Sequence, residues 1–241
     1  MADEGDQAHT DEVRSLFAAI APRYDLINDV QSLGLHRGWK RRVADLASVR
    51  PGDRALDVCC GTGDIAFELA GRGAQVTGLD LCRPMLDRAE RRTESAQGPR
   101  REGYAPPRFV LGDATALPFP DRSFEVVTSG YGLRNLADWR KGLCEMRRVA
   151  VPGGRLVVLD FGRPGNPLWR GAYMAYLRWV VPVIGLALCG NLQAYAYIHG
   201  SVRHYPAQIG LEQGMRETGL QEVSTTSLLC GAMTITRAVC P

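Results

Sequence analysis

Residues 56–64 read LDVCCGTGD, an apolar run that leads into a glycine-rich turn. The apolar residues 54–58 predict a short buried strand, and a helix is expected from about Asp64 to Ala70. In open α/β sheets a ligand binds beyond the carboxyl ends of the strands, and glycines let it approach the backbone there. This stretch therefore predicts an α/β fold and the place of a ligand site within it.

The alternation of strands and helices continues after this turn. Strands are expected at residues 75–79, 108–111, 124–129 and 155–161, with helices at 84–92 and 138–149 and a turn at 152–154. This order predicts βαβ units, and so a doubly wound, mostly parallel sheet. Residues 222–228 and 232–239 are close enough to pair as a C-terminal antiparallel hairpin.

Two amphipathic helices are expected before the glycine-rich turn. Thr10 is a candidate N-cap for the first helix, whose apolar residues recur at spacings of three and four until Pro22. The second helix, over about 35–46, carries a basic face of Arg37, Lys40, Arg41 and Arg42.

Composition and charge exclude several classes of protein. The 29 Lys and Arg residues nearly balance 26 Asp and Glu residues, and the net charge of +3 gives no case for nucleic-acid binding. Seven cysteines, an odd number without CxxC spacing, indicate the reduced thiols of a cytoplasmic protein. The acidic N-terminus lacks the basic and apolar segments of a signal peptide.

The longest apolar stretch covers residues 173–190. Arg178 and Pro182 interrupt it, so its apolar run is shorter than the ~20 residues that span a bilayer. We expect this stretch to form buried helices or a surface that touches lipid.

The glycine-rich turn is compatible with two kinds of ligand. Gly61, Gly63 and Ala66 satisfy the G-x-G-x-x-G/A pattern of dinucleotide sites, so an NAD(P)-dependent oxidoreductase is one interpretation. However, Asp64 would open the following helix where a pyrophosphate should sit, and Asp57 adds a second negative charge. The two carboxylates favour a ligand with cationic groups and no phosphate, such as S-adenosylmethionine.

Two more carboxylates follow predicted strands at the same edge of the sheet. Asp80 suits a ribose, because a carboxylate accepts hydrogen bonds from both hydroxyls. Asp113 suits an adenine amino group, and the backbone N–H beside Ala114 suits a ring nitrogen. The alternative is a structural role, with Asp80 as a helix cap and Asp113 as a turn residue.

Longer stretches carry a family resemblance. They are FAAIAPRYDLINDVQSLGLHRGWK (17–40), LGDATALPFPDRSFEVV (111–127), YGLRNLAD (131–138), PGGRLVVLDF (152–161) and AYAYIHGSVRHYP (194–206). With the glycine-rich turn they resemble the class I S-adenosylmethionine-dependent methyltransferases, and more narrowly the ubiquinone/menaquinone biosynthesis C-methyltransferases. The first stretch is most similar to the demethylmenaquinone enzymes.

The resemblance implies methyl transfer from S-adenosylmethionine to a ring carbon of a prenylated quinol, without a metal. The residues expected to bind the cofactor are Asp57, Gly61, Thr62, Gly63, Asp80, Asp113 and Ala114. Cys59 stands where the wider superfamily has glycine, and Gly130 stands where some members carry a serine.

The resemblance also divides the chain. We expect a flexible tail (1–10) before a single methyltransferase domain (11–241). The parts of the domain are a helical lid (11–50), a cofactor-binding core (51–162), a helical insertion for the acceptor (163–206) and a C-terminal helix with a strand pair (207–241). The insertion could line an isoprenoid groove in peripheral contact with the inner face of the membrane. Whether the chain forms a homodimer is left open.

The residues expected to carry the chemistry are Asp64, Arg134 and Asn135. Asp64 lies beside the expected methyl donor and is a candidate base. Arg134 would stabilise a quinolate oxygen or orient a water that relays the proton to Asp64. The alternative for Arg134 is a surface ion pair with Asp138. Further candidates for proton transfer are His36, His199, His204 and Tyr24.

Other functions remain compatible with the sequence. A relative could methylate a soluble small molecule, and a methyltransferase-like scaffold could serve a biosynthetic complex. The four acidic residues Asp57, Asp64, Asp80 and Asp113 argue against the scaffold, because a decayed site need not keep them.

Overall fold

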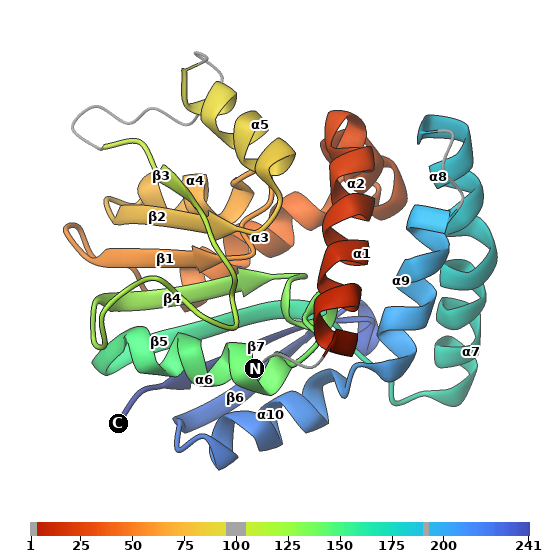
Figure 1. Cartoon of the computed structure of the whole chain (residues 1–241). Coiled ribbons are helices and arrows are strands. Elements are labelled where there is room, and N and C mark those ends of the chain that lie inside the picture. Colours follow the sequence, from red (N-terminus) through yellow and green to blue (C-terminus); the bar gives the residue numbers. More distant parts are fainter. Residues whose placement is uncertain (1–3, 95–104, 190–192) are drawn as a thin grey trace.

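A seven-stranded sheet organises the computed structural model, which describes residues 4–94, 105–189 and 193–241 (Figure 1). The strands are β1 (Arg54–Val58), β2 (Gln75–Asp80), β3 (Arg108–Leu111), β4 (Phe124–Gly130), β5 (Ala150–Phe161), β6 (Gln221–Leu228) and β7 (Met233–Val239). Their order is β3-β2-β1-β4-β5-β7-β6. Strands β1 to β5 are parallel, whereas β7 pairs antiparallel with both β5 and β6. The predicted doubly wound sheet and C-terminal hairpin are confirmed.

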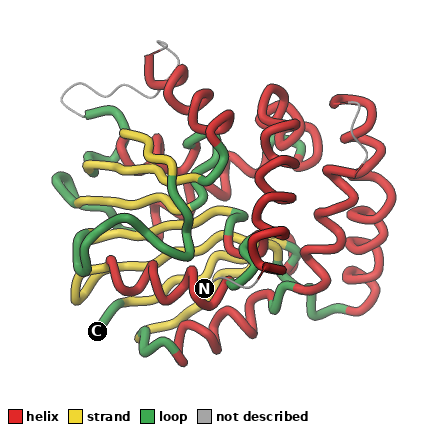
Figure 2. The backbone as a smooth tube through the Cα atoms, viewed as in Figure 1, coloured by secondary structure: helices red, strands yellow, loops and turns green. Residues whose placement is uncertain are grey.

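Helices cover both faces of the sheet and extend beyond one of its edges. They are α1 (Glu4–Ile20), α2 (Tyr24–Ser32), α3 (Leu35–Leu46), α4 (Asp64–Ala70), α5 (Arg83–Glu94), α6 (Trp139–Val149), α7 (Pro167–Ala175), α8 (Val181–Cys189), α9 (Gln193–His204) and α10 (Ala207–Glu217). Apolar residues of α3 and α4 pack on one face, and those of α6 and α10 pack on the other. A third apolar cluster contains residues of α1, α2, α7, α8 and α9. The backbone view in Figure 2 shows these helices grouped beside the sheet.

The N-terminal helix is longer than the sequence predicted. Helix α1 begins at Glu4, so residues 4–10, which were expected to form a tail, belong to this helix. The hydroxyl of Thr10 donates to the carbonyl of Asp6 (2.8 Å) within the helix, so it does not cap the N-terminus. Acidic residues in the first turns favour the helix, because they complement its dipole.

The predicted turn at 152–154 is instead an irregular part of β5. The register against β4 shifts between the pairs Phe124–Ala150 and Val126–Arg155, which leaves extra residues in β5. Gly153 takes up the distortion with a φ of 75° and donates its N–H to the carbonyl of Cys240 (2.9 Å). The glycines therefore form a bulge that pairs with the C-terminal end of the chain.

Helices α7 and α8 join into one continuous helix through a π-helical turn, Tyr176–Val180. Arg178 and Pro182 interrupt the apolar run in the sequence, but the helix continues through both residues. A proline lacks an N–H and clashes with the carbonyl four residues earlier, and a wider turn just before Pro182 relieves both problems. In the part of the chain that the structure describes, the helix over 167–188 is the one long and apolar enough to cross a membrane. Its inner side is buried against α1 and α2 through Tyr173, Leu177 and Val181.

Candidate active site

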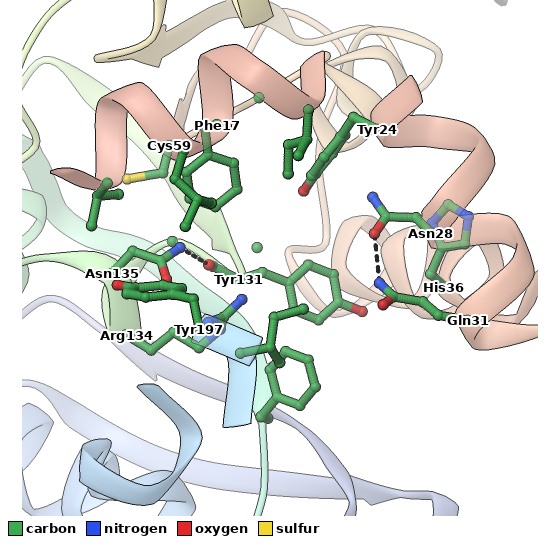
Figure 3. Close-up of a pocket in the computed structure, with 18 of the residues that line it drawn as sticks. Phe17, Tyr24, Asn28, Gln31, His36, Cys59, Tyr131, Arg134, Asn135 and Tyr197 are labelled. Atoms are coloured by element: carbon green, nitrogen blue, oxygen red, sulfur yellow. Dashed lines mark hydrogen bonds between the residues drawn. The ribbon is translucent and has the colours of Figure 1, made fainter. Parts of the chain in front are cut away.

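A cavity of about 840 Å³ lies between the carboxyl edge of the sheet and the added helices. The strand ends and Gly61 form one wall, and mostly apolar side chains of α1, α2, α7 and α8 form the rest. Figure 3 shows polar side chains at two separate places on this wall, one around Asn28 and His36 and the other around Arg134 and Asn135. The volume lies within the range of small-molecule sites in proteins.

Four predicted ligand-binding positions come together on the strand-end wall. Gly61, Asp80 and Asp113 line the cavity, as does the neighbouring Ala114. The Asp80 carboxylate accepts the N–H of Gly61 (2.8 Å) and of Cys82 (2.9 Å). Burial raises the pKa of Asp80, and these amide donors oppose the shift. The prediction that these groups share one edge is confirmed.

Asp113 also has a structural role. Its Oδ1 atom accepts both the N–H (2.7 Å) and the hydroxyl (2.9 Å) of Thr115. The turn after β3 is thereby fixed, and Asp113 still lines the cavity. Capping the turn and facing a ligand are therefore compatible for this carboxylate.

Four other predicted residues lie outside the wall of this cavity. Asp57 is 1% exposed and accepts hydrogen bonds from the Thr128 hydroxyl (2.8 Å) and the Ala66 N–H (3.1 Å). Burial raises the pKa of Asp57 to about 7, and the two hydrogen bonds only partly oppose it. Asp57 thus ties β1 to β4 and α4 beneath the turn.

Thr62 and Gly63 likewise serve the structure around the turn. The Thr62 hydroxyl donates to Asp25 of α2 (2.7 Å). Gly63 has a φ of 86°, and a Cβ atom there would lie 2.9 Å from the ring of Phe109. The glycine is needed for close packing against β3.

Asp64 is held by two cations behind the cavity. Its carboxylate lies 2.6 Å from Lys40 Nζ and 2.7 Å from an Arg92 Nη atom. Burial alone would raise the pKa of Asp64, but Lys40 and Arg92 outweigh it and hold the pKa well below its usual range. A carboxylate with so low a pKa is a poor proton acceptor at neutral pH. The two ion pairs therefore argue against Asp64 as the base.

The ion pair between Lys40 and Asp64 also corrects the predicted basic face of α3. The Lys40 side chain is only 8% exposed, whereas Arg37, Arg41 and Arg42 lie at the surface. The helical periodicity placed Lys40 with its basic neighbours, and no local pattern indicated that a carboxylate of α4 faces it.

Arg134 is buried on the cavity wall. Its Nε atom lies 3.4 Å from Asp160 Oδ1, and an Nη atom donates to the Ser201 hydroxyl of α9 (2.5 Å). The guanidinium carbon lies 4.8 Å from the centre of the Phe161 ring. The Asp138 carboxylate instead accepts the N–H of Lys141 as the N-cap of α6. The alternative of a surface ion pair between Arg134 and Asp138 is wrong.

Asn135 lies beside Arg134 and lines the cavity. Its amide group donates to the carbonyl of Tyr131 (2.9 Å). Its side-chain oxygen is buried and has no hydrogen-bond partner among the described residues. An unpaired buried acceptor is costly, so this oxygen is available to a donor on a ligand.

Several residues at the site were not expected from the sequence. Asp160 forms an ion pair with Arg134. Burial raises the pKa of Asp160 to about 6, although Arg134 opposes the shift. Helix α2, which places Tyr24 and Asn28 on the wall, was not predicted at all. Pro22 indicated the end of the first helix. The apolar spacing of Ile27 and Val30 is a helical signal, but the stretch is too short for this signal to stand out.

The other candidates for proton transfer differ in whether they line the cavity. His36 and Tyr24 line the cavity. His199 lies on α9 but does not line it, and the side chain of His204 lies outside the described part of the structure.

Comparisons with known proteins agree with this geometry. A model of the ubiE/COQ5 methyltransferase family matches residues 4–240. The chain is 45% identical over 211 residues to the demethylmenaquinone methyltransferase of Deinococcus radiodurans, covering 87% of this chain and 85% of that protein. It is 44% identical over 206 residues to the protein of the same name from Thermus thermophilus, covering 85% and 90%.

Solved structures show the same fold. An S-adenosylmethionine-dependent methyltransferase from Thermotoga maritima, described as a possible histamine N-methyltransferase, superposes with a TM-score of 0.67. The alignment covers 95% of this chain and 100% of that one, at 17% identity. At that identity the likeness supports the fold alone.

Proposed function

Because this chain belongs to the ubiE/COQ5 methyltransferase family, we propose that it methylates a ring carbon of demethylmenaquinol with S-adenosyl-L-methionine as donor. The observation that carries the proposal is a cavity of about 840 Å³ that reaches from Asp80 and Asp113 to apolar helices. One end suits a nucleoside with cationic groups, and the other suits a prenylated ring. The alternatives of an NAD(P)-dependent oxidoreductase and a scaffold are not supported by the family.

The residues on the strand-end wall fit the donor. Gly61 faces the cavity with a φ of 55°, and a Cβ atom there would meet only Tyr24, at 3.9 Å. Asp80 would hold the ribose hydroxyls, and Asp113 with Ala114 would hold the adenine. When bound, S-adenosylmethionine supplies an electrophilic methyl group carried by a sulfonium.

The residues around the acceptor must carry out the other parts of the reaction. The ring carbon that receives the methyl group must lose its hydrogen as a proton, and a neighbouring hydroxyl must first be deprotonated to make that carbon nucleophilic. The chain therefore has to orient the ring, exclude water and accept a proton. The apolar wall of α1, α2, α7 and α8 meets the first two needs.

The activity can be tested directly. The purified chain should add one methyl group to demethylmenaquinol, as seen by mass spectrometry of the product. A benzoquinol precursor and a soluble phenol serve as competing acceptors. Accumulation of a desmethyl naphthoquinone in a strain without this protein would identify the substrate in the cell, whereas oxidation of NADH without methylation would contradict the proposal.

Asp80→Ala should weaken S-adenosylmethionine binding by about 1.5–3 kcal/mol, the scale of a hydrogen bond to a charged group. Isothermal calorimetry measures the affinity. Because Asp80 also accepts hydrogen bonds from two backbone N–H groups, a melting curve of the variant must accompany the calorimetry. Asp121→Ala, at a 71% exposed side chain, is the control and should bind normally. Unchanged affinity in folded Asp80→Ala would remove Asp80 from the site.

We further propose that the outer face of the α7–α8 helix rests on the inner surface of the membrane. Trp179, Val183 and Leu186 recur at helical spacing and are 65%, 60% and 48% exposed. Leu33 and Val180, at the rim of the cavity, are 87% and 46% exposed. An apolar rim would let the prenyl tail remain in lipid while the ring enters the cavity.

Trp179→Ser combined with Val183→Ser should lower binding to vesicles about tenfold, because two apolar side chains no longer insert. Co-sedimentation with vesicles containing anionic lipid measures this. Ile209→Ser on α10 is the control, since Ile209 is 76% exposed but does not line the cavity. An equal loss of vesicle binding in the double variant and in Ile209→Ser would exclude this face as the docking surface.

A further inference from the structure

We propose that His36 accepts the proton of the quinol hydroxyl through its Nδ1 atom, and that Asp29 holds the imidazole in position. The inference rests on the proposed methylation of a quinol. It assigns the proton-accepting role to a residue of the N-terminal helices, whereas the sequence had favoured Asp64 next to the glycine turn.

His36 is fixed at the wall of the cavity from behind. It lies in the first turn of α3, lines the cavity, and its side chain is 5% exposed. Its Nε2 atom lies 2.9 Å from Asp29 Oδ1 of α2. Arg37 donates to both oxygens of Asp29, at 2.8 and 2.6 Å. The carboxylate is thus held by Arg37 and in turn orients the ring, as in other oriented bases.

These contacts determine which ring nitrogen carries the hydrogen. A carboxylate accepts only, so Nε2 must be the donor toward Asp29, and in the neutral ring the lone pair then lies on Nδ1. The Nδ1 atom is buried and has no hydrogen-bond partner among the described residues. A hydroxyl donor on a bound ring would satisfy this acceptor.

The charges around His36 keep it ready to accept a proton. Burial lowers its pKa, and Lys40, one turn further along α3, lowers it further. Asp29 and Asp64 oppose the shift without reversing it. The imidazole is therefore neutral at pH 7.

Other groups on the wall are less suited to accept this proton. Burial raises the pKa of both Tyr24 and Tyr131, so these phenols already hold their protons at neutral pH. Arg134 has no lone pair to offer. Asp160 pairs with Arg134 and does not line the cavity.

Polar side chains lie at two separate places on the cavity wall, and we infer that they face the two hydroxyls of a para-quinol. In Figure 3 His36 lies with Asn28 and Gln31 at one end of the site, and Arg134 lies with Asn135 at the other. Such a ring has a hydroxyl at each end, so His36 can take one and Arg134 can hold the other.

The proposed proton transfer begins at the hydroxyl of the quinol. The O–H bond breaks, an N–H bond forms at Nδ1, and the electron pair stays on the ring oxygen and enriches the adjacent carbon. That carbon would then bond to the methyl group of S-adenosylmethionine while the bond between this methyl group and the sulfur breaks, with its electron pair left on the sulfur. The hydrogen on the same carbon would then leave as a proton to water. His36 then returns its proton to the same oxygen, which restores the hydroxyl and the neutral imidazole.

The sharpest test is His36→Gln, because glutamine can still donate to Asp29 but cannot take up a proton. Turnover on demethylmenaquinol should fall about 10²-fold, the low end of general-base contributions, with little change in KM. In the wild type, turnover should fall on the acid side as His36 becomes protonated, and this limb should disappear in the variant. His199→Gln, outside the cavity wall, is the matched control and should keep full turnover.

A readout without turnover completes the test. NMR of ¹⁵N-histidine-labelled protein should show His36 as the neutral Nε2–H tautomer at pH 7, with a pKa below 6.5, the ordinary value. Asp29→Asn should alter this tautomer and lower turnover about tenfold. A folded His36→Gln with wild-type turnover and pH profile, or an Nδ1–H tautomer, would overturn the role of His36. If the wild type methylates no quinol, the proposed function itself fails.

Discussion

Arg134→Ala is expected to lower turnover on demethylmenaquinol about 10²–10³-fold while S-adenosylmethionine affinity stays near the wild-type value. The guanidinium is buried on the cavity wall, fixed by Asp160, Ser201 and the Phe161 ring. It is therefore already oriented before the quinol ring becomes anionic. A group of this kind stabilises charge that develops during the reaction more than it stabilises the bound substrate. The loss should therefore appear in kcat more than in KM.

Arg134→Lys should recover only part of the lost rate, because an ammonium does not replace the planar guanidinium above Phe161. Single-turnover kinetics and a melting curve on the same preparations separate catalysis from stability. Removal of Arg134 also leaves Asp160 buried without its cation, so some destabilisation is expected. Full activity per folded molecule would show that Arg134 only holds α9 and β5 together.

The sheet could be predicted from sequence because its signals are local. The apolar runs at 54–58 and 108–111 match β1 and β3, and Asp64–Ala70 matches α4 to the residue. Such runs are bounded by glycines, prolines and carboxylates that end each element. Strand ends in a parallel sheet also meet at one edge, which is why Asp80 and Asp113 could be placed together.

The partners of the charged residues could not be predicted, because they depend on how distant elements pack. Asp64 pairs with Lys40, 24 residues earlier, and Arg134 reaches Ser201, 67 residues later. Neither pairing leaves a periodic signal in the chain. The same limit explains why Asp57 and Thr62 were expected to meet a ligand, although one supports the turn and the other holds α2.

Lys40→Met should lower the free energy of unfolding by about 3 kcal/mol near pH 7, the low end of the loss when one partner of a buried ion pair is removed. Lys40 Nζ lies 2.6 Å from Asp64, and the two side chains are 8% and 21% exposed. Methionine keeps most of the apolar stem of lysine but leaves Asp64 with Arg92 alone. Because Arg92 remains, we expect the lower end of the range.

The pH dependence identifies the cause of this loss. Lys40 and Arg92 hold the pKa of Asp64 below its unfolded value of about 3.9, so their stabilisation is present above that pH and is lost as the pH falls below it. We therefore expect urea unfolding to give a difference in the free energy of unfolding between wild type and Lys40→Met. This difference should be constant from pH 5 to 7 and should become smaller below pH 4. Arg41→Met, at an exposed neighbour on α3, is the control and should cost under about 0.5 kcal/mol.

A double-mutant cycle then separates the ion pair from the packing of the lysine stem. Adding Asp64→Asn to Lys40→Met should cost less than Asp64→Asn costs alone, because Lys40, the buried cation that Asp64→Asn alone would leave unpaired, is then also absent. Additive losses would mean that Lys40 stabilises α3 only through its stem. Since His36 lies one turn before Lys40 on α3, we expect the ion pair also to help position that imidazole at the cavity. Lys40→Met should therefore lose turnover per folded molecule, and Arg41→Met should not.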